Sequence, residues 1–222
     1  YRDLKKYKEM RPEGDSTPID LYPLFNWDGE AGTASGMYFH QDLWAAKKIF
    51  EENPDSHIDI ASRIDGFIAH LLVFTEVKYV DNRPLESELD NLHFIQADAT
   101  KMERFDDSSF DSVSSLNAAE HFGLGRYDDP IDPRGSVKFM HSLQRVLAPG
   151  GKLYFSVPIG KERVEFNAHR VFSPQTVLDT FDELELISFA ATVDGNLNTS
   201  VAPDDLGDRR DGFDCGLFEF TK

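Results

Sequence analysis

The chain has 222 residues, 40% of them hydrophobic and 28% charged, which predicts one well-packed globular domain rather than two small ones. Its 40 acidic and 23 basic residues give a net charge of −17, which argues against a nucleic-acid partner because a phosphate backbone attracts positive surfaces. No apolar run approaches the roughly 18 residues of a bilayer span, so membrane insertion is not expected, and the single Cys215 excludes an internal disulfide and favours a reducing, cytoplasmic setting.

The N-terminal part of the chain predicts an arm followed by a helix. The first 36 residues are rich in proline, glycine and acids, which is typical of an irregular arm. A helix ended by Pro54 follows, because apolar residues recur at roughly helical spacing before it: Tyr38, Leu43, Ile49 and Phe50. This helix either packs on the domain or closes over a ligand as a lid. We expect residues 1–54 to form the arm and lid helix, and residues 55–222 to form one globular unit.

Strands and helices alternate from residue 56 onward. Strands are predicted in HIDIA, VKYVD, LHFIQAD, FDSVSSL and KLYFSVPI, with a final strand pair in LELISFAAT and CGLFEFTK. Helices are predicted in GFIAHLLVF, in RGSVKFMHSLQRVL, which the APGG breaker closes, and in SPQTVLDTF. Ser173 is the expected N-cap of the last helix, with Pro174 at its first position. This alternation predicts an α/β fold with a doubly wound, Rossmann-like sheet.

The turn after the first strand has the position of a nucleotide-binding loop but lacks its glycines. The strand ends on Asp59, and Ala61, Ser62 and Arg63 stand where such a loop places glycine, which returns only at Gly66. Glycine allows positive φ angles and a close approach of backbone to ligand. A Cβ at Ala61 is tolerable if φ there is negative, and Arg63 could either cover a cofactor carboxylate or fill the space itself. The turn is therefore either an altered cofactor loop or an ordinary strand-to-helix turn.

Two further acids follow the next two predicted strands, at the edge where such sheets bind ligands. Asp81 lies 22 positions after Asp59, where a carboxylate grips ribose hydroxyls. Asp98 could accept a hydrogen bond from an exocyclic adenine amine, with the amide of Ala99 facing the ring. Each acid alone could instead cap a turn. Together they favour a nucleoside-type cofactor, and a dinucleotide dehydrogenase explains them less well because it leaves Asp98 without a role and depends more on loop glycines.

The order of these motifs resembles that of class I S-adenosylmethionine-dependent methyltransferases. The resemblance covers about residues 56–190 and rests on HIDIA…G, VKYVD, QADAT, FDSVSSLNAAEHF and VLAPGGKLYFSVP. YFHQDLWAAKKI, EHFGLGRY and HRVFSP are similar to an uncharacterised branch often assigned to surface-polysaccharide or glycan modification. The resemblance implies a mostly parallel seven-stranded sheet with an antiparallel last strand, and S-adenosylmethionine as cofactor. It implies Asp59 near the methionine end, Asp81 at the ribose, and Asp98 with Ala99 at the adenine.

The loop after the fourth strand supplies the candidate chemistry. It is long and punctuated by glycine, which suits an active-site loop, and it begins at Asn117, which we count among the cofactor-binding residues. Glu120 and His121 are the candidate acid/base pair, since histidine titrates near neutral pH. His121 could instead contact the methyl donor or pack in the fold. Arg126 and Tyr127 could bind a hydroxyl-rich or acidic substrate or belong to a solvated loop.

The segments after the fifth and sixth strands should face the same cleft. His169 and Arg170 either contact substrate or brace the loop before them. The acidic stretch from Asp194 to Asp214 is either a substrate-selecting flap or a solvated loop. No metal site is expected, because the His and acidic residues lack compact ligand spacing.

The predicted function is an S-adenosylmethionine-dependent methyltransferase acting on a small-molecule or glycan-linked acceptor. The competing hypothesis is a non-catalytic binding or assembly module with the same fold and an altered cofactor loop. The sequence does not indicate the acceptor atom or the oligomeric state.

Overall fold

The computed structural model describes residues 2–24, 32–126 and 129–222. Contacts divide the chain into two compact units, Tyr1–Thr33 and Ala34–Lys222. The first unit contains helix α1 (Arg2–Glu9), in which no residue is buried. The prediction of an irregular arm is therefore wrong for this segment, where Lys5 and Glu9 pair one helical turn apart at 3.8 Å. Within the described ranges, no helix combines the length and apolar character needed to cross a membrane.

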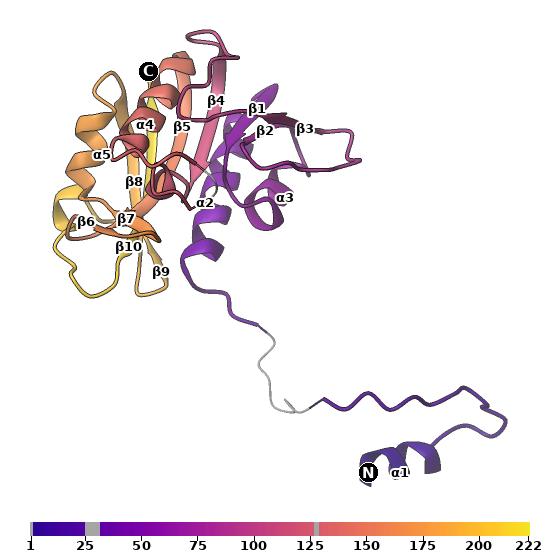
Figure 1. The fold of residues 1–222 in the computed structure, drawn as a ribbon. Coiled ribbons are helices and arrows are strands. Elements are labelled where there is room, and N and C mark those ends of the chain that lie inside the picture. The colour runs from indigo at the N-terminus through magenta and orange to yellow at the C-terminus, as the bar shows by residue number, and fades with distance from the viewer. Residues whose placement is uncertain (1, 25–31, 127–128) are drawn as a thin grey trace. The chain divides into compact units, whose positions relative to one another are not determined.

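The second unit is built on an eight-stranded sheet with the order β3-β2-β1-β4-β5-β10-β8-β9 (Figure 1). Neighbours from β3 to β5 pair in parallel, whereas β10 runs antiparallel to both β5 and β8. This confirms the expected Rossmann-like fold, and the short β9 extends the expected seven strands by one. The strands are β1 (Ser56–Ile60), β2 (Glu76–Asp81), β3 (Leu92–Gln96), β4 (Phe110–Leu116), β5 (Leu147–Ile159), β8 (Glu185–Val193), β9 (Asn196–Asn198) and β10 (Asp214–Thr221).

Helices cover both faces of this sheet. One face carries α2 (Met37–Glu52), a π-helical turn (Ile64–Ile68) and α3 (Ala69–Leu71), and the other carries α4 (Gly135–Val146) and α5 (Pro174–Thr180), which lie side by side in Figure 1. Ser173 caps α5 as expected, because its hydroxyl accepts a hydrogen bond from the amide of Thr176 at 3.1 Å. Short 3-10 turns lie at Ala119–His121 and Pro203–Asp205, and β6 (Arg163–Glu165) pairs with β7 (His169–Val171) in a separate small sheet.

Alternating side chains along the strands pack into two core layers, one on each face of the sheet. On β5, Tyr154 packs with Trp44 and Ile49 of α2, while its neighbour Phe155 packs with Phe139 of α4 and Phe181 after α5. All these side chains are at most 8% exposed. Because successive strand residues point to opposite faces, one apolar run supplies both layers.

Of the four apolar residues predicted to share one face of α2, only Ile49 is buried. Tyr38, Leu43 and Phe50 are at least 41% exposed, whereas Trp44 and Ile49 are buried. At about 100° per residue, Leu43 and Phe50 fall roughly 120–140° around the helix from Tyr38, so the chosen residues do not share a face. The buried residues of α2 are Gln41, Asp42, Trp44, Ala45, Ala46 and Ile49.

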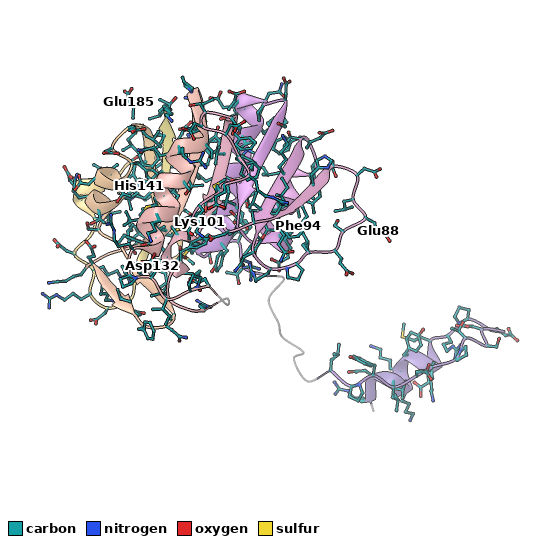
Figure 2. All side chains as sticks on the ribbon, turned by 45° about the horizontal axis from the view of Figure 1, so that its top comes forward. Glu88, Phe94, Lys101, Asp132, His141 and Glu185 are labelled. Carbon is teal, nitrogen blue, oxygen red and sulfur yellow. The ribbon has the colours of Figure 1, made fainter. Side chains whose placement is uncertain are left out.

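The sheet presents one edge at which several parallel strands end together. Because β1 lies between β2 and β4, the chain leaves β1 toward β2 on one side and later returns to β4 on the other, and ligands bind at such a reversal in α/β sheets. Figure 2 shows the breadth of the unit, with Glu88 on the loop before β3 toward one end and Glu185 at the start of β8 toward the other.

Candidate active site

A cavity of about 590 Å³ lies where β1, β2, β4 and β5 end. Its walls come from residues 61–65 after β1, residues 81–85 at the end of β2, residues 117–122 after β4, and Pro158 of β5. A second cavity of about 340 Å³ reaches the loop after β3. The two cavities share five lining residues, which are Ala61, Asp81, Asn82, Phe122 and Asp129. Together they form an elongated site across the carboxyl ends of the parallel strands.

The buried carboxylate of Asp59 stabilises the turn after β1 by hydrogen bonds. Its carboxylate accepts hydrogen bonds from the amide of Ser62 at 3.0 Å and from the hydroxyls of Ser62 and Ser114 at 2.6 and 2.5 Å. Burial raises the pKa of Asp59 to about 7, although these hydrogen bonds oppose the shift. The side chain is fully buried and lines neither cavity. Its contacts are those of a residue that positions the turn.

His57 extends this buried network across β1 and β4. Its Nδ1 and Nε2 atoms each lie 2.7 Å from a serine hydroxyl, of Ser112 and Ser114 respectively. Because the Ser114 hydroxyl donates to Asp59, Nε2 of His57 donates to Ser114 and Nδ1 accepts from Ser112. Burial lowers the pKa of His57 to about 3, so the ring is neutral. Sequence analysis did not identify this network, although polar residues alternating within two buried strands were its signal.

The residues that replace glycine after β1 lie at the cavity wall. Ala61 has a φ of 62°, so it adopts the left-handed conformation that glycine takes most readily, and the condition of a negative φ is not met. Arg63 pairs with Asp65 at 3.1 Å and its guanidinium lies 4.7 Å from the centre of the Tyr38 ring on α2. Gly66 lines neither cavity; a side chain there would collide with Asp42 of α2. Of the residues predicted for this loop, Ala61, Ser62 and Arg63 therefore line the larger cavity, whereas Asp59 and Gly66 do not.

Asp81 is buried at the end of β2 and binds Arg83. Its Oδ1 accepts from the amide and Nε of Arg83 at 2.8 and 2.9 Å, and its Oδ2 accepts from Nη2 of Arg83 at 2.7 Å and from the Tyr79 hydroxyl at 3.2 Å. Burial alone would raise the pKa of Asp81, but the hydrogen bonds and charge of Arg83 lower it below its ordinary value. Asp81 is therefore an ionised carboxylate at the junction of the two cavities. Sequence analysis missed Arg83 and Tyr79.

Asp98 and Ala99 line the second cavity. Asp98 is about half exposed, and its Oδ1 accepts hydrogen bonds from the amide and hydroxyl of Thr100 at 2.9 and 2.6 Å. Ala99 is buried beside it. The two residues stand at the β3 end of the site, where Phe122 and Gly123 of the loop after β4 also line the wall.

Asn117, Glu120 and His121 meet at the other end of the site. Asn117 has a φ of 49°, and its Nδ2 and the Oε2 of Glu120 have no hydrogen-bond partner among the described residues. Burial raises the pKa of Glu120 to about 8 and lowers that of His121 to about 4, so both are neutral near pH 7. His121 Nε2 lies 3.6 Å from Glu120 Oε1, too far for a hydrogen bond. The expected acid/base pair therefore shares one wall of the cavity.

The candidate substrate residues divide between the cavity wall and the loop behind it. Arg126 donates to the carbonyl of Ala168 at 2.8 Å and His169 lies 3.2 Å from Glu165, and Arg126 and His169 line the cavity. Arg170 is buried and donates to the carbonyl oxygens of Phe122 at 2.6 Å and Glu120 at 3.5 Å. These are the contacts of a loop brace. Tyr127 lies outside the described residues.

The stretch between β8 and β10 contributes one residue that sequence analysis missed. Phe213 lines the larger cavity, with its ring 5.1 Å from that of His169. Arg209 holds the stretch by pairing with Asp194 at 2.7 Å and with Asp214 at 2.5 Å. An aromatic residue directly before a predicted strand that begins at the cleft was the available signal. Within the described ranges, no three His, Cys, Asp or Glu side chains form a group able to hold a metal ion.

Comparisons with known proteins agree with this fold. The family model "Caenorhabditis protein of unknown function, DUF268" matches residues 60–201. No curated protein matches the sequence significantly. Solved structures do match: the YcgJ protein of Bacillus subtilis has a TM-score of 0.56 at 17% identity, covering 82% of this chain and 98% of its own.

Two named methyltransferases are among the similar structures. The N-methyltransferase NodS of Bradyrhizobium japonicum, in complex with S-adenosyl-L-homocysteine, has a TM-score of 0.57 at 14% identity over 84% of this chain and 88% of its own. The 1,6-didemethyltoxoflavin-N1-methyltransferase of Burkholderia thailandensis, with bound 1,6-didemethyltoxoflavin and S-adenosylhomocysteine, has a TM-score of 0.56 at 13% identity over 82% and 78%. At these identities the likeness establishes the methyltransferase fold.

Proposed function

The chain belongs to the DUF268 family, and we propose that it transfers a methyl group from S-adenosylmethionine to a small-molecule or glycan-linked acceptor. The observation that carries the proposal is the buried, ionised Asp81 at the junction of two cavities, at the end of β2. A carboxylate there can accept a hydrogen bond from each of two vicinal ribose hydroxyls. Structures of similar fold with bound S-adenosylhomocysteine support the same cofactor class.

The donor groups around the two cavities fit this cofactor. Asp98 and the amide of Ala99 would hold the adenine in the smaller cavity, and Asp81 the ribose at the junction. Ala61, Ser62 and the backbone at Asn117 would hold the amino-acid end in the larger cavity, with Asp59 positioning the turn. The elongated shape of the joined cavities matches a ligand with a nucleoside half and an amino-acid half.

The residues beyond the expected methyl position suit alignment of an acceptor. S-adenosylmethionine, when bound, supplies an electrophilic methyl group on a sulfonium. Methyl transfer mainly requires alignment of a nucleophile and exclusion of water. Nδ1 of neutral His121 donates to the carbonyl of Ala168 at 2.8 Å, so Nε2 carries the lone pair of the ring and would be the atom that accepts a hydrogen bond from an acceptor hydroxyl or amine. Glu120 is the stronger base of the two once ionised, since its pKa is about 8.

The acceptor would lie against the loops after β4 and β5. Arg126, His169 and Phe213 offer it one charged, one polar and one aromatic contact. Tyr127 belongs to the same proposed set. A glycan-linked acceptor rests on the sequence motifs alone, and the similar structures add no support for it.

Calorimetric titration with S-adenosylmethionine and S-adenosylhomocysteine tests the proposal. We expect both to bind, and Asp81→Ala to weaken binding about 100-fold because it removes the acceptor of two charge-assisted hydrogen bonds. Asp90→Ala, which removes an exposed acid from the loop before β3, is the control and should leave affinity unchanged. No binding at millimolar ligand would overturn the proposal and favour the competing function, a non-catalytic binding or assembly module.

A further inference from the structure

The carboxylate of Asp81 has no acceptor position left for a ligand. A carboxylate offers about four lone-pair sites, and Asp81 receives three hydrogen bonds from Arg83 and one from Tyr79. The Tyr79 hydroxyl also donates to the carbonyl of Ser62 at 2.9 Å, so its single proton serves Asp81 only in part. The firm contacts of Asp81 are those from Arg83.

We propose that Arg83 is an internal competitor of the ribose: its guanidinium occupies Asp81 and has to leave when vicinal hydroxyls bind there. The inference rests on the proposed function, because it assigns Asp81 to the ribose. The bonds from Nε and Nη2 form a bidentate fork on both carboxylate oxygens, which are the atoms that two hydroxyls would use. The amide of Arg83 can keep its own bond to Oδ1, since it belongs to the backbone of the turn.

The geometry makes this exchange possible. The Arg83 side chain is 52% exposed, whereas that of Asp81 is 5% exposed. The guanidinium can therefore move into solvent, but the carboxylate cannot. Arg83 also lines the larger cavity and lies in an irregular stretch after β2. The mobile partner of the ion pair is thus the arginine, on the side from which the ligand enters.

The exchange sets the apparent affinity for the cofactor. A ligand gains two hydrogen bonds to a buried carboxylate but loses the ion pair already present, so part of its intrinsic affinity is cancelled. Because the arginine is half exposed, the pair is of moderate strength, and removing the guanidinium should tighten binding about five- to tenfold. Salt screens a partly exposed ion pair, so wild-type affinity should rise with ionic strength.

The test compares S-adenosylhomocysteine binding by calorimetry in wild type, Arg83→Met and Arg83→Lys, at low and high salt. We expect Arg83→Met to bind about five- to tenfold more tightly and to lose the salt-dependent gain, with Arg83→Lys between the two because lysine cannot form the fork. Arg104→Met is the matched control, since it removes an exposed arginine that donates to Gln96 and lines neither cavity. Its affinity should equal that of wild type.

A ligand without the two ribose hydroxyls shows whether Arg83 competes with those hydroxyls for Asp81 or affects binding only through its positive charge. The 2′,3′-dideoxy analogue of S-adenosylhomocysteine does not need Asp81, so Arg83→Met should leave its affinity unchanged. Equal or weaker binding of S-adenosylhomocysteine by Arg83→Met would overturn the inference while leaving the proposed function intact. A crystal structure of the complex in which the Arg83 guanidinium still makes its bidentate hydrogen bonds to Asp81 would also overturn the inference and leave the proposed function intact. Failure of wild type and all variants to bind would overturn the proposed function and the inference together.

Discussion

The carboxylate of Asp59 holds Ser62 by two hydrogen bonds, one from its amide at 3.0 Å and one from its hydroxyl at 2.6 Å. The Ser62 hydroxyl oxygen in turn accepts from the amide of Leu116 at 2.8 Å. One buried acid therefore ties the turn after β1 to the end of β4. The loops after β1 and β4, which would contact the amino-acid end and the methyl group of the cofactor, are therefore both positioned by Asp59.

Asp59→Ala should destabilise the fold by about 2–4 kcal/mol, because it leaves the buried Ser62 and Ser114 donors without their acceptor. Asp59→Asn is the matched comparison and should cost less than Asp59→Ala, since it keeps the shape and one of the two acceptor oxygens. Denaturant unfolding at neutral pH measures both. Equal losses in the two variants would show that the turn needs both carboxylate oxygens as acceptors.

Ala61→Gly should stabilise the protein by up to about 1 kcal/mol. A left-handed conformation costs an alanine roughly 1–2 kcal/mol, part of which is offset by the greater freedom of glycine in the unfolded chain. The control is Ala69→Gly, in which an exposed alanine with a helical φ of −60° should instead lose about 1 kcal/mol. Measured by thermal or denaturant unfolding, the change in stability should be positive for Ala61→Gly and negative for Ala69→Gly. A loss of stability in both variants would refute the strain at Ala61.

The order of strands was accessible from the sequence because each one is a short apolar run closed by a polar or breaker residue. The three acids Asp59, Asp81 and Asp98 follow three successive strands, and parallel topology then gathers them at one edge. The N-cap of α5 was equally readable, since Ser173 and Pro174 act on their own local backbone. These features depend on neighbours in the sequence.

Features that depend on contacts between residues far apart in the sequence could not be predicted. The buried face of α2 depends on contacts with the π-helical turn, α3 and the sheet, so Leu43 and Phe50 remain exposed while Trp44 is buried. Asp59 was expected to bind cofactor, and its carboxylate is bonded to Ser62 of its own turn and to Ser114 of β4. Arg83 was missed because a charged residue two positions after a strand is ordinarily solvated, and its ion pair with the buried Asp81 is a feature of the folded structure.

Arg170→Met should destabilise the loop after β4. The guanidinium is buried and donates to the carbonyls of Phe122 and Glu120, so its loss leaves acceptors unsatisfied at a cost of about 1–3 kcal/mol. Hydrogen exchange should rise in residues 117–125 more than in β1. Arg104→Met serves again as an exposed control with no expected effect. Unchanged exchange in the loop would mean that Arg170 does not brace it.

Glu120 should make the stability of the protein fall between about pH 4.5 and about pH 8. Burial raises its folded-state pKa from 4.5 to about 8, so in this window the folded protein keeps a proton that the unfolded chain has lost. Proton binding by the folded state then makes the free energy of unfolding decrease as pH rises, by about 1.4 kcal/mol per unit for one such group. Below the window both states are protonated, and above it both are ionised.

Glu120→Gln isolates this contribution, because every other titrating group is common to both proteins. The difference in unfolding free energy between variant and wild type should grow with pH through the window, by up to about 1.4 kcal/mol per unit, and should level off above about pH 8. Asp59 titrates in part of the same range, which is why the difference between the two curves and not either slope is the quantity to measure. Parallel curves would mean that Glu120 is ionised throughout, and the carboxyl would then need a cationic or hydrated partner in the folded protein.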